Sequence, residues 1–354
     1  MRKIVYILVN CLLCLACQKE LSVSDDVFIS IDNVASLSDF SQYSYPEMEN
    51  TWIITDQEAS LESLQGLCSA LKAAQDREIS LEFVNLVEFP SSISFEIAPF
   101  RDIVSLVSVS LPKATSIGSW VFFESNSLRE IYAPKLNYVG EYAFYNNQNL
   151  ENIVCSSVLS VGDYAFYLCS NLASVYPLEQ EITSSSETIG CYAFYECDSL
   201  RQFPMWSVSE VGEASFYGCN VLSDLNFLSL SKMGEKAFYN CYALSEIILP
   251  MLSVLPNSAF RGCSSLISVV AGMCGELHYD ALTKCKNLTT LELSTSLNAL
   301  LSYVDEGCFT GSNTQTKPSS ISLSLGAYSK DFTVVDKQLD CGDYSIVFKE
   351  ILLK

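Results

Sequence analysis

The sequence contains a single histidine, His278, among 354 residues, and it has no glycine-rich loop of the kind that cradles phosphates. No potential nucleophile is flanked by a base. Acidic residues such as Asp224 and Glu246 recur at equivalent positions of the repeat described below. There we expect open strands, not a pocket that would separate two carboxyl pKa values. We therefore expect no enzymatic activity, cofactor or metal site, and we interpret His278 as a turn residue.

Basic residues are also scarce. Lysine and arginine total 20 against 41 aspartates and glutamates, which gives a formal charge of −21. So acidic a chain repels phosphate backbones and anionic lipid, and we exclude nucleic acid as a partner. After the first 16 residues, no run reaches the ~18 apolar residues typical of a transmembrane helix. Any membrane contact therefore requires a covalent anchor.

Residues 1–16 have the features of a secretory signal. The short basic start Arg2-Lys3 precedes an apolar run over residues 4–15, interrupted by Asn10. About a dozen apolar residues are too few to span a bilayer in the mature protein, so we predict that this segment is removed. Removal deletes two positive charges and takes the formal charge from −21 to −23.

The stretch Leu13-Cys14-Leu15-Ala16-Cys17 resembles the lipobox of bacterial lipoproteins, except that Cys14 stands where an aliphatic residue is usual. The resemblance implies acylation of Cys17, and Gln18-Lys19-Glu20 resembles an acidic export tag. We expect an outer-membrane lipoprotein of a Gram-negative bacterium, exposed at the surface and held by lipid alone. Ordinary secretion with cleavage nearby is the alternative. Residues 17–50, rich in Ser, Asp and Glu, are predicted to form the anchor and a flexible tether.

A 22-residue repeat dominates the rest of the chain. Its units start at Ile117, Val139, Val161, Ile189, Val211, Met233, Leu255 and Leu277. The one longer interval contains an insertion of six residues around 180–187. Each unit has an apolar residue, usually Gly, two variable residues, Ala-Phe, three positions ending in Cys, and then Leu-x-x-Ile-x-apolar.

The second half of each unit predicts a strand in which Leu150, Ile153 and Cys155, for example, point inward. The first half predicts a tight turn on the opposite side, where Gly permits an unusual backbone dihedral and Phe fills the centre of the coil. One unit cannot bury its own apolar edge, so the units must stack.

The repeat resembles the BspA-like subfamily of leucine-rich repeats over residues 95–325. The resemblance implies a leucine-rich-repeat solenoid: a parallel β-sheet with short turns or helical turns on the opposite side. For the subfamily it also implies adhesion to host proteins or other cells. The repeat consensus does not encode binding residues, so no individual site carries over.

We expect a cap at each end of the solenoid. In residues 51–94, Thr55-Asp56-Gln57-Glu58 has the spacing of a capping box. One face of the following helix would carry Leu61, Leu64, Leu67, Leu71 and Ala74, and a strand would begin at Ile79. Ile321 and Leu323 fit a last repeat strand. In residues 326–354, the segments 333–335 and 344–348 predict a hairpin that closes the stack.

A cysteine recurs at one position of the repeat, as Cys169, Cys197, Cys219, Cys241, Cys263 and Cys285, with Ser125 and Asn147 at the same position earlier. Spacing of 22 residues matches no usual zinc pattern. Neighbouring rungs lie within disulfide distance, but side chains in a ladder point the same way. We favour reduced thiols that hydrogen-bond beneath the turn, with disulfides as the alternative.

Two columns are candidate binding surfaces. The outward face of the sheet would present Glu130, Tyr132, Val154, Tyr176, Asn226, Glu246, Ile248 and Val270. The turn side would present Tyr145, Tyr167, Tyr195, Tyr217 and Tyr239. Solenoids generally bind through the sheet face, and an exposed apolar strip marks an interaction site. Alternatively, the tyrosine rings pack on neighbouring coils and shield the backbone, which we favour.

We therefore expect a cell-surface binding protein that engages a macromolecular ligand, protein more than glycan, through its sheet face. The alternative is a glycan-binding or assembly component of an outer-membrane complex. A glycan binder should have aromatic side chains standing free on one face.

Overall fold

The computed structural model describes residues 34–36, 50–155, 159–177, 187–203, 208–223, 225, 227–278, 280–288, 290–293, 322–325, 338–340, 345–347 and 350–353. The expected signal segment, the lipidation candidate Cys17 and the insertion around residue 180 lie outside these residues. In the described part, no helix is long and apolar enough to cross a membrane.

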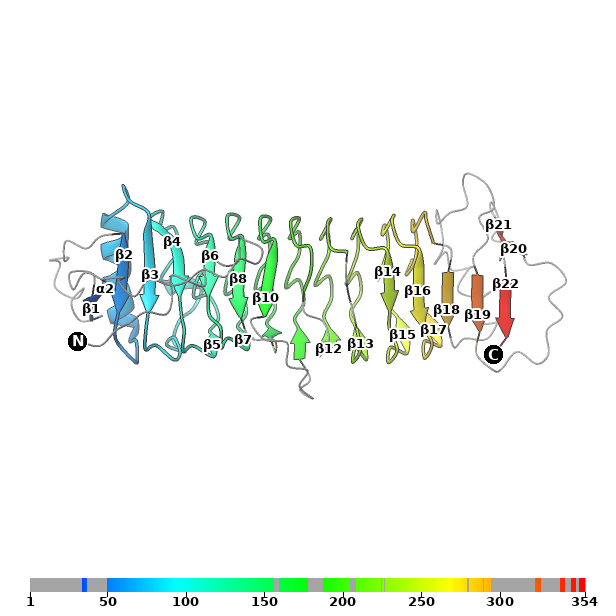
Figure 1. Ribbon diagram of the computed structural model, residues 1–354, viewed down its shortest axis with the longest axis horizontal. Helices are drawn as coiled ribbons and strands as arrows, with labels where there is room; N and C mark the ends of the chain where they lie inside the picture. Colours follow the sequence, from blue (N-terminus) through cyan, green and yellow to red (C-terminus); the bar gives the residue numbers. More distant parts are fainter. Residues whose placement is uncertain are drawn as a thin grey trace, which may run out of the picture.

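The coils stack into a rod with a parallel sheet along its length (Figure 1). The first seven strands of this sheet are β1 (Val34–Ala35), β2 (Thr51–Ile54), β3 (Ile79–Phe83), β4 (Leu106–Ser110), β6 (Glu130–Tyr132), β8 (Asn152–Cys155) and β10 (Ser174–Pro177). The later coils form a five-stranded sheet from β14 (Glu246–Ile248), β16 (Ser268–Ala271), β18 (Thr290–Leu293), β19 (Ser322–Leu325) and β22 (Glu350–Leu353). Together these strands form what we call the main sheet.

Short strands form a second set of ladders along another edge of the rod (Figure 1). One ladder contains β5 (Ser116–Ile117), β7 (Tyr138–Val139), β9 (Ser160–Val161), β11 (Glu187–Ile189), β12 (Val208–Val211) and β13 (Lys232–Met233). The other pairs β15 (Val254–Leu255) with β17 (Glu276–Leu277). A 3₁₀ turn, η3 (Phe95–Ile97), precedes the first full coil.

Strand register confirms the repeat. Glu130 lies opposite Asn152, and Asn152 lies opposite Ser174, so the pairing advances by the 22-residue period. The longer interval appears as the pairing of Val161 with Ile189. The inserted residues therefore leave the ladder intact.

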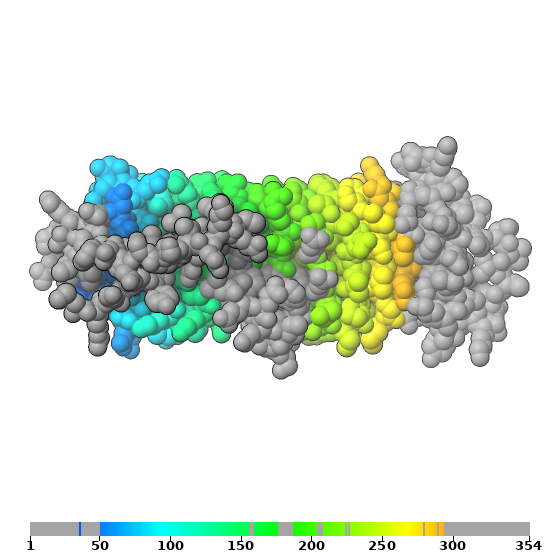
Figure 2. Space-filling view, in the orientation of Figure 1, coloured from blue at the N-terminus to red at the C-terminus, as the bar shows by residue number. Residues whose placement is uncertain are grey.

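Aligned phenylalanines fill the centre of the coils. The rings of Phe122, Phe144, Phe166, Phe194, Phe216, Phe238 and Phe260 are fully buried, and their successive centroids lie 5.0 to 5.5 Å apart. Leu150, Ile153 and Cys155 are also fully buried, as the alternation in the strand predicts. The space-filling view shows the described coils packed one against the next along the rod (Figure 2).

The glycine of each unit has a different role from the one we expected. Among the described glycines, only Gly218 and Gly262 have positive φ, and neither occupies this position. A Cβ on Gly140 would instead lie 2.5 Å from the backbone nitrogen of Ser119 in the preceding coil. Glycine is therefore required because neighbouring backbones approach closely, not because of an unusual dihedral.

Residues two before and two after each central phenylalanine adopt the left-handed conformation. Tyr142 and Asn146, with φ of 54° and 58°, flank Phe144 in this way. The backbone N–H groups of all three residues donate to carbonyl oxygens of the next coil at 2.7 to 3.0 Å. These hydrogen bonds offset the roughly 1–2 kcal/mol that a left-handed residue costs.

The N-terminal cap contains helix α2 (Leu61–Ala73), which buries Leu64, Leu67 and Leu71. The expected capping box is wrong. Ser60 is the N-cap, and its side chain and that of Ser63 accept reciprocal backbone hydrogen bonds. Thr55 instead follows β2 and donates its N–H to Ala35 in β1.

Short strands at both ends of the chain extend or close the stack. The pair β1–β2 lies partly within residues 17–50, for which we expected a tether. At the other end, β19 pairs with β18 as predicted from Ile321 and Leu323. An antiparallel pair is formed by β20 (Gln338–Asp340) and β21 (Ser345–Val347). Strand β21 lies within the predicted segment 344–348, whereas the predicted segment 333–335 lies outside the described residues. The last of the described strands, β22, was not expected.

Candidate binding surfaces

The cysteine column is structural. Cys169, Cys197, Cys219, Cys241, Cys263 and Cys285 are buried free thiols, and each donates to the carbonyl oxygen of the phenylalanine one coil earlier at 3.1 to 3.2 Å. Ser125 and Asn147 donate to Phe100 and Phe122 in the same way, both at 2.8 Å. Burial raises the pKa of the Cys263 thiol to about 12. The predicted ladder of hydrogen-bonding thiols is confirmed for these residues.

The turn-side tyrosines form an aromatic ladder. The rings of Phe123, Tyr145, Tyr167, Tyr195, Tyr217 and Tyr239 stack with centroids 4.7 to 5.0 Å apart and interplanar angles of 4° to 14°. Each interior ring lies between two neighbours, so both of its π-faces are occupied. These side chains pack on neighbouring coils, as we favoured from the sequence.

An arginine closes each end of this aromatic ladder. The Arg101 guanidinium lies 4.5 Å from the Phe123 centroid, and that of Arg261 lies 5.9 Å from the Tyr239 centroid. Both arginines occupy the same repeat position as the aromatic residues, 22 residues before Phe123 and 22 after Tyr239. The exposed end faces of the stack are therefore covered by the chain's own cations.

A second aromatic column stacks beside the first. Its members are Trp120, Tyr142, Tyr164 and Tyr192, with centroid separations of 4.1 to 5.0 Å. The Tyr192 hydroxyl donates to Glu213 at 2.7 Å, and this hydrogen bond with burial raises the pKa of Tyr192 to about 12. This column, too, presents ring edges and hydroxyl groups more than open faces.

The first half of the main sheet's outward face is mixed in character. Tyr132 and Val154 lie side by side in register and are half-buried, while Glu130 is exposed. The backbone of Tyr176 continues this row opposite Val154. Asn226 lies outside the described residues.

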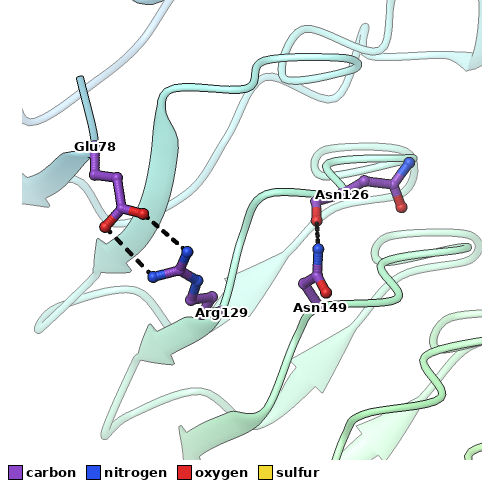
Figure 3. Close-up of polar contacts among 4 residues, drawn as sticks. All are labelled: Glu78, Asn126, Arg129 and Asn149. Carbon is purple, nitrogen blue, oxygen red and sulfur yellow. Dashed lines mark hydrogen bonds and ion pairs between the residues drawn. The ribbon is translucent and has the colours of Figure 1, made fainter. Parts of the chain in front are cut away.

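Charges beside the same coils are paired. The Arg129 guanidinium donates two hydrogen bonds to Glu78, at 2.8 and 3.3 Å (Figure 3). In the next coil, the side chain of Asn149 donates to the Asn126 carbonyl oxygen at 2.7 Å (Figure 3). Both contacts are exposed, so they contribute little to stability. They connect side chains of different coils and hold these side chains in position on the surface.

The second half of the outward face combines apolar and acidic side chains. Ile248 is 50 % exposed and lies opposite Val270 in register, with exposed Glu246 two residues before Ile248. At the corner that follows the strands, Met251 is 50 % exposed and Met273 is 56 % exposed. The two methionines are 22 residues apart and therefore occupy equivalent positions of successive coils.

Sequence reasoning missed the corner methionines. They lie beyond the alternating strand pattern, in the loop that leaves each strand. Aligning that loop would have found them, because the equivalent residues of the early coils are Lys113 and Lys135. The same corner is therefore cationic early in the stack and apolar late in it.

The single histidine lies beside an acidic side chain at the surface. The His278 ring lies 2.8 Å from the Glu276 carboxylate, and both side chains are substantially exposed just after or within β17. Among the described residues, no group of His, Cys, Asp and Glu is arranged to hold a metal ion.

Comparison with solved structures finds other leucine-rich repeat proteins. A crystal structure of a T. pallidum leucine-rich repeat protein is 18% identical over 58% of this chain and 86% of that chain, with a TM-score of 0.37. A leucine-rich repeat protein from Bacteroides ovatus is 19% identical over 66% and 82%, with a TM-score of 0.32. None of the curated proteins compared with the chain matches it. These TM-scores are low, so the family rests on sequence.

The family model described as "BspA type Leucine rich repeat region (6 copies)" matches residues 92–206 and 187–316. The two matches overlap and together cover more than half of the chain. The protein belongs to the BspA-type leucine-rich repeat family.

Proposed function

We propose that this protein binds macromolecular partners at a bacterial cell surface, in adhesion to host proteins or to other cells. The proposal rests mainly on the apolar residues of the main sheet's outward face, above all the exposed Ile248. Outward positions of a solvated sheet are normally polar, and a contiguous exposed apolar strip marks an interaction site. A solenoid also presents such a strip over a long surface, which suits a large partner.

The stacking of the aromatic columns supports a protein partner over a glycan. Sugar rings bind to open aromatic faces, and in the aromatic ladder those faces contact other rings. The Arg101 and Arg261 guanidinium groups lie over the end rings. The family consists typically of binding proteins without enzymatic activity, which agrees with the exposed His278–Glu276 pair.

Attachment to the outer membrane through an acylated Cys17 is part of the same proposal. It is supported by the signal-like residues 1–16 and by the resemblance of residues 13–17 to a lipobox. Several acyl chains would anchor the chain stably, and the acidic surface would oppose adsorption to anionic lipid.

A binding screen tests the function. The mature chain would be immobilised and exposed to host matrix proteins and to a glycan panel, with an Ile248→Ser, Tyr132→Ser variant alongside. We expect a protein to bind, and the variant to weaken binding while its melting temperature changes little. Binding of glycans alone would favour the alternative function. Loss of folding in the variant would mean that these side chains are core.

A further inference from the structure

We propose that the late coils dock a short apolar segment of a partner protein that also carries lysine or arginine. The docking surface, which we call the methionine corner, consists of Leu228, Glu246, Ile248, Met251 and Met273. This inference rests on the proposed function and names the part of the surface and the kind of partner.

The methionine corner exposes four large apolar side chains on three successive coils. Leu228 and Met273 are each 56 % exposed, and Ile248 and Met251 are each 50 % exposed. Methionine is unbranched and polarisable, so it adapts to partners of varied shape. These large side chains are half-exposed on adjacent coils. A partner that covers them therefore removes a large apolar area from water.

Charge decides what kind of segment fits. Glu246 is exposed on β14 beside Ile248, and Glu292 in β18 lies opposite Val270. The outward positions of the described strands β14, β16 and β18 contain no lysine or arginine. A second copy of this acidic chain would be repelled, whereas a cationic segment is complementary.

The size of the corner sets the length of the segment. Neighbouring strands are ~4.8 Å apart, so the first and the third of these three coils lie roughly 10 Å apart. That distance matches about two helical turns or three extended residues. A contact this short binds weakly alone, so repeated copies at a cell surface would supply avidity.

The early coils show that the fold tolerates other residues at this corner. Lys113 and Lys135 occupy the positions of Met251 and Met273, and Ser229 occupies the same position one coil before Met251. Serine replacements of both methionines therefore keep the coil and leave the net charge unchanged. Glu151, in an early coil and outside both candidate surfaces, is exposed like Glu246 and provides a control with the same loss of charge.

The test uses the full mature chain and an amphipathic helical peptide of about four turns built from leucine and lysine. Comparison probes are a leucine–glutamate peptide and oligolysine. We expect the leucine–lysine peptide to bind, and Met251→Ser with Met273→Ser to weaken it about tenfold or more, as lost apolar burial requires. Glu246→Ser should also weaken it, and the controls Tyr138→Ser and Glu151→Ser should not.

Three outcomes would overturn the inference: equal affinity of the methionine variant and the parent chain, stronger binding of the leucine–glutamate peptide, or oligolysine bound as tightly as the leucine–lysine peptide. The melting temperature of each variant must match that of the parent chain, and Met251→Lys with Met273→Lys provides a second variant with residues the chain uses there. If a host protein binds but the methionine variants bind it normally, the proposed function survives and this inference fails.

Discussion

Arg101 and Arg261 occupy the same position of the repeat at opposite ends of one aromatic ladder, and each places its guanidinium over the last ring of the stack. Each is also paired with a carboxylate, Arg101 with Glu124 at 3.3 Å and Arg261 with Asp280. An interior ring has two aromatic neighbours, whereas an end ring has one. The arginines cover the remaining faces, and they limit the ladder to the coils between them.

Removal of Arg261 should destabilise the late coils. Asp280 is almost fully buried, and its carboxylate also accepts from the Thr283 hydroxyl at 2.8 Å. We expect Arg261→Met to cost about 3 kcal/mol, because it leaves a buried charge without its cation. Urea denaturation checks this, with Asp280→Asn and the double variant completing a cycle. The two side chains are coupled if the double variant loses less free energy of unfolding than the two single variants lose together. A loss equal to that sum would contradict the pairing.

Breaking the aromatic ladder in its middle should also lower stability. The Tyr167 ring stacks on Tyr145 at 5.0 Å and on Tyr195 at 4.9 Å. Each aromatic pair contributes roughly 0.5–1.5 kcal/mol beyond its burial, so Tyr167→Ser should cost about 2 kcal/mol or more. Tyr138→Ser, at an exposed strand position, should cost under about 0.5 kcal/mol. Equal thermal shifts for the two variants would show that stacking contributes nothing measurable.

The repeat allowed much of this architecture to be predicted. Inward positions recur at the same place in every unit, so the core residues and the 22-residue register followed from alignment. The role of the cysteines also followed, because Ser125 and Asn147 replace cysteine within the same chain and all three types can donate a hydrogen bond. Comparison between units therefore identified the hydrogen-bonding role of this position, which one unit alone would not have shown.

Features that depend on distances between coils could not be predicted in this way. The close backbone approach at Gly140 involves the coil before it, and a single unit gives no sign of it. Thr55 has the spacing of a helix cap, but it follows β2 and pairs with β1, so Ser60 caps α2. The exposure of Met251 and Met273 depends on how each corner leaves the sheet.

The buried thiols should make the protein sensitive to alkali. Burial raises the pKa of Cys155 and Cys263 to about 12, whereas a thiol in the unfolded chain has a pKa near 9.0. Between these values the unfolded state binds fewer protons than the folded state, so stability falls as pH rises. Each such thiol should cost about 1.4 kcal/mol per pH unit above the unfolded pKa. Their stabilising effect is fully present below pH 9.

Urea denaturation at about pH 8 and pH 10 would measure this loss, with Cys263→Ser as the control that removes one titrating group. In the native state at neutral pH, the described buried cysteines should resist alkylation, and mass spectrometry should detect their reaction after unfolding. A free-energy difference between the two pH values that is unaffected by Cys263→Ser would contradict the assignment to that thiol.

Acylation should depend on Cys17 alone. We expect incorporation of labelled palmitate into the full chain expressed in a Gram-negative host and its loss in Cys17→Ala, because the residue after the cleavage site is the acyl acceptor in a lipobox. Membrane fractionation should show the same change, since no second anchor is predicted. Cys14→Ala is the matched control and should remain labelled; persistent labelling of Cys17→Ala would refute the anchor.

The glycines of the repeat provide a matched pair in which only the distance between coils differs. A Cβ on Gly212 would lie 2.6 Å from the backbone nitrogen of Cys191, whereas on Gly118 its nearest neighbour would be a Val121 methyl at 3.8 Å. Gly212→Ala must therefore push two backbones apart and should cost about 3 kcal/mol or more. Gly118→Ala has room and should be neutral or slightly stabilising, because alanine reduces the freedom of the unfolded chain. Melting temperatures of the two variants measured together would check the difference, and comparable losses in both would mean that glycine serves the backbone conformation instead of the approach of the coils.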